Sequence, residues 1–336
     1  MSLKLSVLDL TPISEGSSSA ETLRHSCELA LAVDALGYHR YWFSEHHNTD
    51  MLASASPEIL VGHIAQQTQH LRVGTGGIML PNHQPLKVAE NFRLLNTLYP
   101  DRIDLGLGRA PGTDLQTAFA LRGHSPAQGE DFPQQLQQLW HYLHDNTGPI
   151  QAIPLDAPAP AVWLLGSSTF SAQLAARLGL PFAFAHHIQP EPAAQALALY
   201  QAQFQPSAVC AAPQNMLAVS VICADTDEEA SMLAQSADLM WLRFRSRQGR
   251  PGPLPSLATA QSQVYSEAEK QVIAFNRQRM FVGSPERLQQ ELGALVQAWG
   301  VQELMVSTLV YDPQARQRSY ELLAQAFSDQ KTASDA

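Results

Sequence analysis

Residues 71–108, "LRVGTGGIMLPNHQPLKVAENFRLLNTLYPDRIDLGLG", decide the fold, because they read as a strand, a helix and a second strand. The aliphatic and β-branched ends, "LRVGTGGIML" and "RIDLGLG", predict strands. Residues 85–99 between them have the spacing of a helix. Strands joined by a crossover helix run parallel, so this stretch predicts one βαβ unit.

The same alternation repeats along the chain. Strands are predicted at residues 5–10, 41–44, 71–80, 102–108, 161–166, 181–185, 216–223 and 303–310. Helices are predicted at about 20–36, from residue 57, and at 85–99, 134–143, 171–179, 193–204, 227–242, 285–299 and 314–327. Eight alternations without a long gap predict a closed (β/α)8 TIM barrel, one domain over residues 1–336. Two Rossmann-like halves are the alternative.

Residues 243–263 interrupt this pattern before the eighth strand. They are rich in Pro, Gly, Arg, Ser and Gln, which predicts a mobile insertion rather than a linker to another domain. The insertion could be a lid over the barrel mouth or a solvated basic loop.

Composition excludes several classes of function. The chain has 21 basic and 31 acidic residues and a net charge of −10, which argues against nucleic acid or an anionic membrane as a partner. Cys27, Cys210 and Cys223 lie far apart, so neither a thiolate zinc site nor a disulfide framework is expected. The first residues do not form a signal peptide, and no long apolar run occurs, so we expect a cytoplasmic protein.

An acid and two histidines follow the second predicted strand, in "YWFSEHHNTD" at residues 41–50. Neighbours on an extended strand point to opposite faces, so His46 and His47 would not bind one metal unless the backbone turns between them. Three readings stay open: a proton-handling site, a metal-dependent hydrolase, or structural histidines. At the rim of a barrel, where active sites of this fold lie, the following histidines would gather: His46, His47, His83, His186 and His187.

Two glycine-rich stretches are candidates for ligand contact. "DLGLGRAPGTD" has glycines one residue off the dinucleotide fingerprint. Bare backbone at Gly106 and Gly108 would let a flat ligand approach, with Arg109 as an anion contact. A glycine-rich turn is the alternative. At Thr75, Gly76 and Gly77, a close approach by a ligand and a plain β-bulge are both possible.

Gly166, Ser167 and Ser168 lie between a predicted strand and a helix. Free N–H groups at a helix start, with two hydroxyls beside them, form a phosphate site without lysines. Ordinary capping by either serine is the alternative.

Together, "WFSEHHN", "VGTGGIMLPNHQPLKVAE" and "DRIDLGLGRAPGTD" resemble the bacterial luciferase-like monooxygenases, flavin-dependent (β/α)8 barrels. The resemblance implies that His46 handles a proton near the flavin ring, with Glu45 and His47 as orienting neighbours. It also implies a cis peptide at Gly76–Gly77 under the ring. The cofactor-binding residues we expect are Thr75, Gly76, Gly77, Gly108, Arg109, Gly166, Ser167 and Ser168, and we expect no metal. Gly108 stands where bacterial luciferase has a reactive cysteine, which puts light emission in doubt.

The resemblance implies a monooxygenase that receives reduced FMN from a separate flavin reductase and forms a C4a-peroxyflavin with O2. Its substrate would be a small organic molecule, in a pocket lined by residues such as Met79, Phe132, His186 and His187. The alternatives are hydride transfer with a deazaflavin and a non-catalytic flavin-binding protein. The family also implies a homodimer through the helices after the second and third strands.

Overall fold

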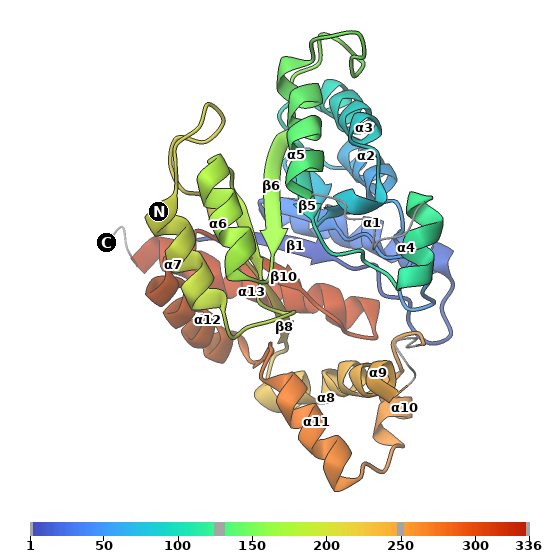
Figure 1. Ribbon diagram of the computed structural model, residues 1–336. Coiled ribbons are helices and arrows are strands. Elements are labelled where there is room, and N and C mark those ends of the chain that lie inside the picture. The colour runs from blue at the N-terminus through green and yellow to red at the C-terminus, as the bar shows by residue number, and fades with distance from the viewer. Residues whose placement is uncertain (1–2, 124–131, 247–251, 334–336) are drawn as a thin grey trace.

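A computed structural model describes residues 3–123, 132–246 and 252–333 (Figure 1). The strands are β1 (Lys4–Asp9), β2 (Arg40–Phe43), β3 (Arg72–Thr75), β4 (Ile78–Met79), β5 (Ile103–Gly108), β6 (Ala161–Gly166), β7 (Phe182–Ala185), β8 (Asn215–Cys223), β9 (Met280–Gly283) and β10 (Glu303–Ser307). The helices around the barrel are α1 (Ser19–Ala35), α2 (Pro57–Gln67), the 3₁₀ turn η1 (Leu80–Asn82), α3 (Pro85–Leu98), α4 (Leu115–Arg122), α5 (Phe132–Trp140), the π turn η3 (His141–Asp145), α6 (Thr169–Leu178), α7 (Ala193–Gln203), α12 (Pro285–Trp299) and α13 (Pro313–Ala333). Between β8 and β9 come α8 (Asp227–Leu233), α9 (Gln235–Ser246), α10 (Leu257–Gln261) and α11 (Glu267–Arg277).

The sheet closes on itself as a parallel barrel. Its order is β10-β1-β2-β3-β5-β6-β7-β8, and β8 pairs with β10 to complete the ring. β1 pairs with β10 from Lys4 opposite Glu303 to Val7 opposite Val306. The prediction of a (β/α)8 barrel is therefore confirmed, and each of the eight predicted strands is found in it.

The third predicted strand is interrupted. β3 and β4 both pair with β5, and the peptide bond between Gly76 and Gly77, which separates them, is cis. A cis bond at this position is what the family resemblance implied.

On several strands the inward-facing side chains become smaller toward the carboxyl end of the barrel. A layer of large residues, including Leu8, Trp42 and Trp163, fills the middle. Side chains on one face of a strand recur every second residue. Two residues beyond this layer, four strands carry small side chains into the mouth: Ser44, Ala185, Ser220 and Ser307.

The insertion before β10 is larger and more ordered than predicted. Figure 1 shows α8 to α11 grouped at the end of the barrel toward which the β6 arrow points. Helix α11 and strand β9, which pairs with β8, were not predicted from the sequence. Leu254 is fully buried, and its N–H donates to the carbonyl of Ile13 after β1. Residues 247–251 lie outside the described residues, and the lid function stays a prediction.

Candidate active site

Glu45, directly after β2, is the centre of a buried hydrogen-bond cluster. Its carboxylate has no exposed surface and accepts hydrogen bonds from His47 Nε2 at 2.8 Å and from the Met79 N–H at 2.9 Å. His83 Nε2 lies 3.0 Å from both carboxylate oxygens, and Asn82 Nδ2 donates at 3.3 Å. We call Glu45, His47, Asn82 and His83 the Glu45 cluster. It joins the loops that follow β2 and β4.

The electrostatics of this cluster favour a charged pair. Burial alone would raise the pKa of Glu45, but hydrogen bonds from His47, His83 and the Met79 N–H outweigh it and hold the pKa at about 2. Burial opposes the charged form of His83, yet its hydrogen bond and attraction to Glu45 raise its pKa above 6.5. Glu45 is therefore ionised at neutral pH and favours a proton on His83.

His46 has different surroundings from those of its neighbour. Its ring Nδ1 lies 3.1 Å from the Ser44 hydroxyl, and its backbone N–H donates to the Ser54 carbonyl. Glu45 hydrogen-bonds to His47 and His83 rather than to this ring, so any orienting effect of Glu45 on His46 would be indirect and stays a prediction. Burial lowers the pKa of His46 to about 4, against the attraction of Glu45. His46 is therefore neutral at pH 7, when it can accept a proton.

His187 lies on the opposite side of the barrel mouth. It follows β7, which is four strands away from β2 in the ring of eight. Its Nδ1 lies 3.1 Å from the carbonyl of Ala218. Because a carbonyl can only accept, Nδ1 carries the hydrogen and Nε2 keeps its lone pair when the ring is neutral. Burial lowers the pKa of His187, which favours that neutral form.

Packing requires the two glycines between β3 and β4. A Cβ at Gly76 would lie 2.7 Å from Leu8 Cδ1, and one at Gly77 would lie 2.6 Å from the Gly106 carbonyl. Thr75 is fully buried, and its hydroxyl bonds to the carbonyl and N–H of Gly106 at 3.1 and 3.2 Å. Any part that Thr75 takes in binding would therefore be indirect, through the position of this backbone.

The glycines of β5 are explained mainly by packing. A Cβ at Gly106 would collide with the Thr75 carbonyl, and the space over Gly108 holds the Met79 side chain at 2.8 Å from such a Cβ. Packing therefore explains the bare backbone at Gly106, and its role in binding a ligand stays a prediction. At Gly108 a ligand would have to displace Met79, whose side chain is flexible.

The start of α6 can accept an anion. Ser168 is the N-cap residue, but its hydroxyl makes no capping hydrogen bond. Ordinary capping, the alternative reading of this motif, is therefore not what the hydroxyl does. Arg109, exposed at the end of β5, lies 4.9 Å above the ring of Phe170 in the first turn of α6. A guanidinium, two serines and free helix N–H groups thus meet at one place, which suits a phosphate.

Some residues named from the sequence lie elsewhere. Phe132 is buried in a hydrophobic core cluster, and a place for it in the substrate pocket stays a prediction. His186 is also buried, with its ring 5.6 Å from Phe281 and 6.1 Å from Trp299. Asn82 and Ser44 were missed as members of the site. No local signal marks them, because their partners are defined only when the strand ends come together.

The described part of the chain has no group of three or more His, Cys, Asp or Glu side chains arranged to hold a metal ion. Within the same residues, no helix is long and apolar enough to cross a membrane.

Comparison with known proteins gives the family. The family described as luciferase-like monooxygenase matches residues 3–303. This chain belongs to that family. A luciferase-like monooxygenase from Escherichia coli strain K12 is 42% identical over 322 residues, covering 95% of this chain and 96% of that protein. An N-acetyl-S-alkylcysteine monooxygenase from Bacillus subtilis strain 168 is 32% identical, covering 96% and 98%.

Solved structures of the family have the same barrel. The structure of apo-MsnO8 has a TM-score of 0.89 and 41% identity, covering 97% of this chain and 98% of that one. Two more distant structures share the fold. The oxygenating component of a diketocamphane monooxygenase from Pseudomonas putida, in complex with FMN, has a TM-score of 0.71 at 20% identity. An F420-dependent secondary alcohol dehydrogenase has a TM-score of 0.70 at 12% identity.

The site fits a flavin phosphate and ring. The uncapped Ser168 hydroxyl and Arg109 meet at the start of α6, as a phosphate group requires. Gly76 and Gly77 carry no side chains of their own, although Leu8 and Leu165 pack against their backbone.

Proposed function

We propose that this protein is the oxygenase of a two-component flavin monooxygenase, which takes reduced FMN from a separate flavin reductase and oxidises a small organic substrate with O2. The observation that carries the proposal is the uncapped start of α6 beside Arg109, at the same end of the barrel as His46. Bound reduced FMN would supply the electrons that activate O2, and the protein would bind, orient and shield it.

Each group of residues has its own part in this proposal. Ser167, Ser168 and Arg109 bind the phosphate, Gly166 allows the turn into α6, and Gly76–Gly77 supports the ring. Gly166 is required here because a side chain would collide with that of Ser171. His46, neutral at working pH, accepts or shares a proton at the substrate side of the ring.

The substrate class follows from relatives. The Bacillus subtilis relative named for N-acetyl-S-alkylcysteine suggests thioethers as the first compounds to test. The mouth of the barrel, with small side chains such as Ser220 and Ser307, would receive a compound of this size.

The first experiment is a titration of the purified protein with FMN and, without oxygen, with photoreduced FMN. Tighter binding of the reduced form supports an oxygenase that works with a reductase. Binding of a deazaflavin with no oxygen uptake would instead favour hydride transfer. FMN binding without turnover of any substrate would leave a flavin-binding protein.

Replacement of His46 by Ala tests its role. We expect turnover to fall by roughly 10²-fold or more, as on loss of a general acid–base group, while FMN binding changes little. His70→Ala is the matched control, since the His70 side chain is 78% exposed. Unchanged turnover in His46→Ala would remove His46 from the reaction.

We also propose a homodimer through α2 and α3. Exposed apolar side chains on these adjacent helices would be covered by a second copy: Ile59 at 69% exposure, Leu94 at 51% and Leu98 at 60%.

A further inference from the structure

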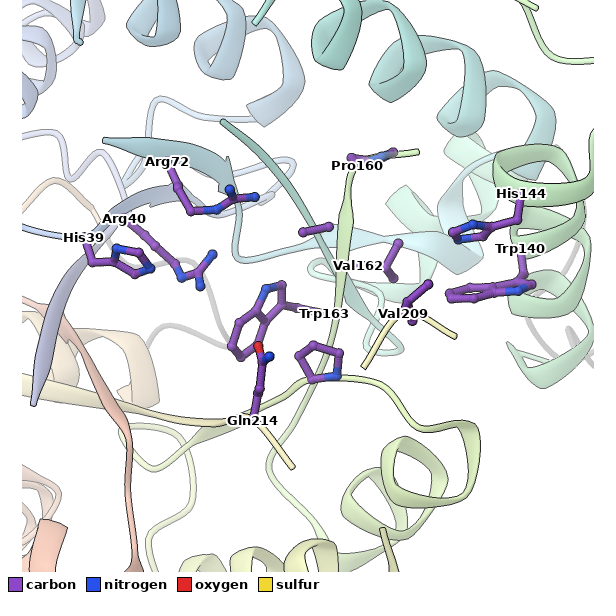
Figure 2. Close-up of a pocket in the computed structure, with 12 residues that line it drawn as sticks. His39, Arg40, Arg72, Trp140, His144, Pro160, Val162, Trp163, Val209 and Gln214 are labelled. Atoms are coloured by element: carbon purple, nitrogen blue, oxygen red, sulfur yellow. The ribbon is translucent and has the colours of Figure 1, made fainter. Parts of the chain in front are cut away.

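The amino-terminal end of the barrel has a cavity of about 340 Å³. Arg40 and Arg72, the first residues of β2 and β3, reach one end of it with His39, and Trp140 and His144 line the other end (Figure 2). The residues assigned to the flavin site lie at the carboxyl ends of the strands, so this cavity is separate from that site.

Arg40 offers a hydrogen-bond donor to the cavity. Its side chain is only 8% exposed, its Nε donates to Glu303 at 3.0 Å, and its Nη1 donates to Asp104 at 2.7 Å. Its second terminal nitrogen, Nη2, has no acceptor in residues 3–123, 132–246 and 252–333. The ion pairs therefore occupy two of the three nitrogens and leave Nη2 free to donate to a ligand in the cavity.

The charge at this end favours an anion. Three cationic side chains, Lys4, Arg40 and Arg72, stand against two carboxylates: Asp104 and Glu303. The pKa of His39 agrees with a positive potential at this end. Burial together with Arg40 and Lys4 lowers this pKa to about 4. His39 is therefore neutral at pH 7 and does not change the count of positive and negative side chains at this end.

The rest of the wall is apolar and flat. The Arg40 guanidinium lies 4.8 Å above the Trp163 ring, and Trp140 stacks on His144 with 4.0 Å between ring centres. Val162 and Val209 line the space between Trp163 and Trp140 (Figure 2). The volume lies at the lower end of the range for small-molecule sites, which suits a molecule with one ring.

We propose that this cavity is a second ligand site, which binds a small carboxylate with a single-ring apolar body. The carboxylate accepts a hydrogen bond from Arg40 Nη2, and the ring lies between Trp163 and Trp140. The charged end and the apolar end of the cavity together define this class of ligand.

Calorimetric titration of the whole protein with phenylacetate tests the proposal, with phenylacetamide and acetate as matched probes. Phenylacetate should bind at least about tenfold more tightly than either, because the amide lacks the charge and acetate lacks the ring. Equal binding of phenylacetate and phenylacetamide, or no binding of phenylacetate, would overturn the proposal.

Two variants locate the site without breaking the Arg40 ion pairs. Gln214 is exposed and lines the cavity, so Gln214→Glu adds a negative charge with little change of shape. It should weaken phenylacetate by about fivefold or more and leave phenylacetamide unchanged. Val209→Trp should fill the cavity and reduce binding of both probes. Binding of photoreduced FMN should stay the same in both variants, and competition between phenylacetate and FMN would place the probe in the flavin site instead.

Discussion

At the scale of single residues, Glu45 has the largest structural role in the proposed active site. Its charge is buried but satisfied by donors from two loops, His47 on one side and Met79, Asn82 and His83 on the other. Asn82 also donates to the carbonyl of Pro111 at 2.8 Å, which links the loop after β5 to the same cluster. The carboxylate therefore fixes three loops around His46.

Replacing Glu45 by Gln should destabilise the fold by about 3 kcal/mol, because His83 and the other donors lose a buried charged acceptor. Urea unfolding at pH 5.5 measures the change. Asp50→Asn, an exposed acid in the same loop, should change stability by less than about 0.5 kcal/mol. A Glu45→Gln protein as stable as the wild type would show that the cluster contributes no net energy.

The same cluster gives stability a defined dependence on pH. The pKa of Glu45 falls from 4.5 to about 2 on folding, so its contribution is present above pH 4.5 and is lost as pH falls toward 2. The pKa of His83 is raised from 6.5, so its contribution is present below pH 6.5 and is lost as pH rises through the raised value. The difference in unfolding free energy between wild type and Glu45→Gln should be largest at pH 4.5–6.5 and smaller at pH 3 and pH 9. A constant difference would contradict this assignment.

Residues of the site could be predicted where a local motif carries them. Glu45, His46 and His47 stand together, and Ser167 and Ser168 occur at a strand-to-helix joint. The hydrogen bond between Glu45 and His83 could not be predicted. His83 lies 38 residues away, and nothing near it in the sequence indicates that it bonds to a carboxylate.

At the scale of elements, two helix starts differ in how the hydroxyl of the N-cap serine is used. Ser18 before α1 forms a full capping box with Glu21, whereas Ser168 before α6 leaves its hydroxyl without a capping bond. The two serines are chemically alike and stand at the same position of a helix. The N-cap serines of α2 and α12, Ser56 and Ser284, are also uncapped, so it is Arg109 beside α6 that favours the proposed phosphate site there.

Ser18→Ala should cost about 1 kcal/mol of stability and leave FMN binding unchanged. Ser168→Ala should cost less than about 0.5 kcal/mol but weaken FMN binding roughly tenfold, since it removes a donor to the phosphate. Thermal unfolding and fluorescence titration measure the two effects. Equal FMN binding by Ser168→Ala and wild type would count against the phosphate site.

Elements with a strong period were predictable, and those shaped by tertiary contacts were not. The eight barrel strands are aliphatic runs, and all were found. β9 has four residues and gains its strand conformation by pairing with β8. The division between β3 and β4 depends on the backbone at Gly76–Gly77. Neither feature has a hydrophobic period of its own.

At the scale of the whole molecule, the two ends of the barrel differ in character. The carboxyl end carries small side chains, glycines, the neutral His46 and the Glu45–His83 pair, whereas the amino end carries the ion pairs of Arg40 with Asp104 and Glu303. The exposed apolar face of α2 and α3 lies on the side of the barrel. A dimer formed there would leave both ends open.

Sedimentation should find the wild-type protein as a dimer. Replacing both Ile59 and Leu98 by Lys should give a folded monomer, because two buried charges would oppose association. Val264→Lys is the control, since Val264 is 97% exposed and lies outside this face. A wild-type monomer, or a dimer that survives both substitutions, would rule out this interface.

Closure of the barrel also affects how the chain is made. Lys4–Val7 pair with Glu303–Val306, so the ring cannot close until the ribosome has synthesised the last strand. At a synthesis rate of about 5–20 residues per second, that wait is roughly 15–60 s. During it, the edge of β1 that later pairs with β10 is open to other chains. The nascent protein is therefore expected to depend on chaperones that cover strand edges until translation ends.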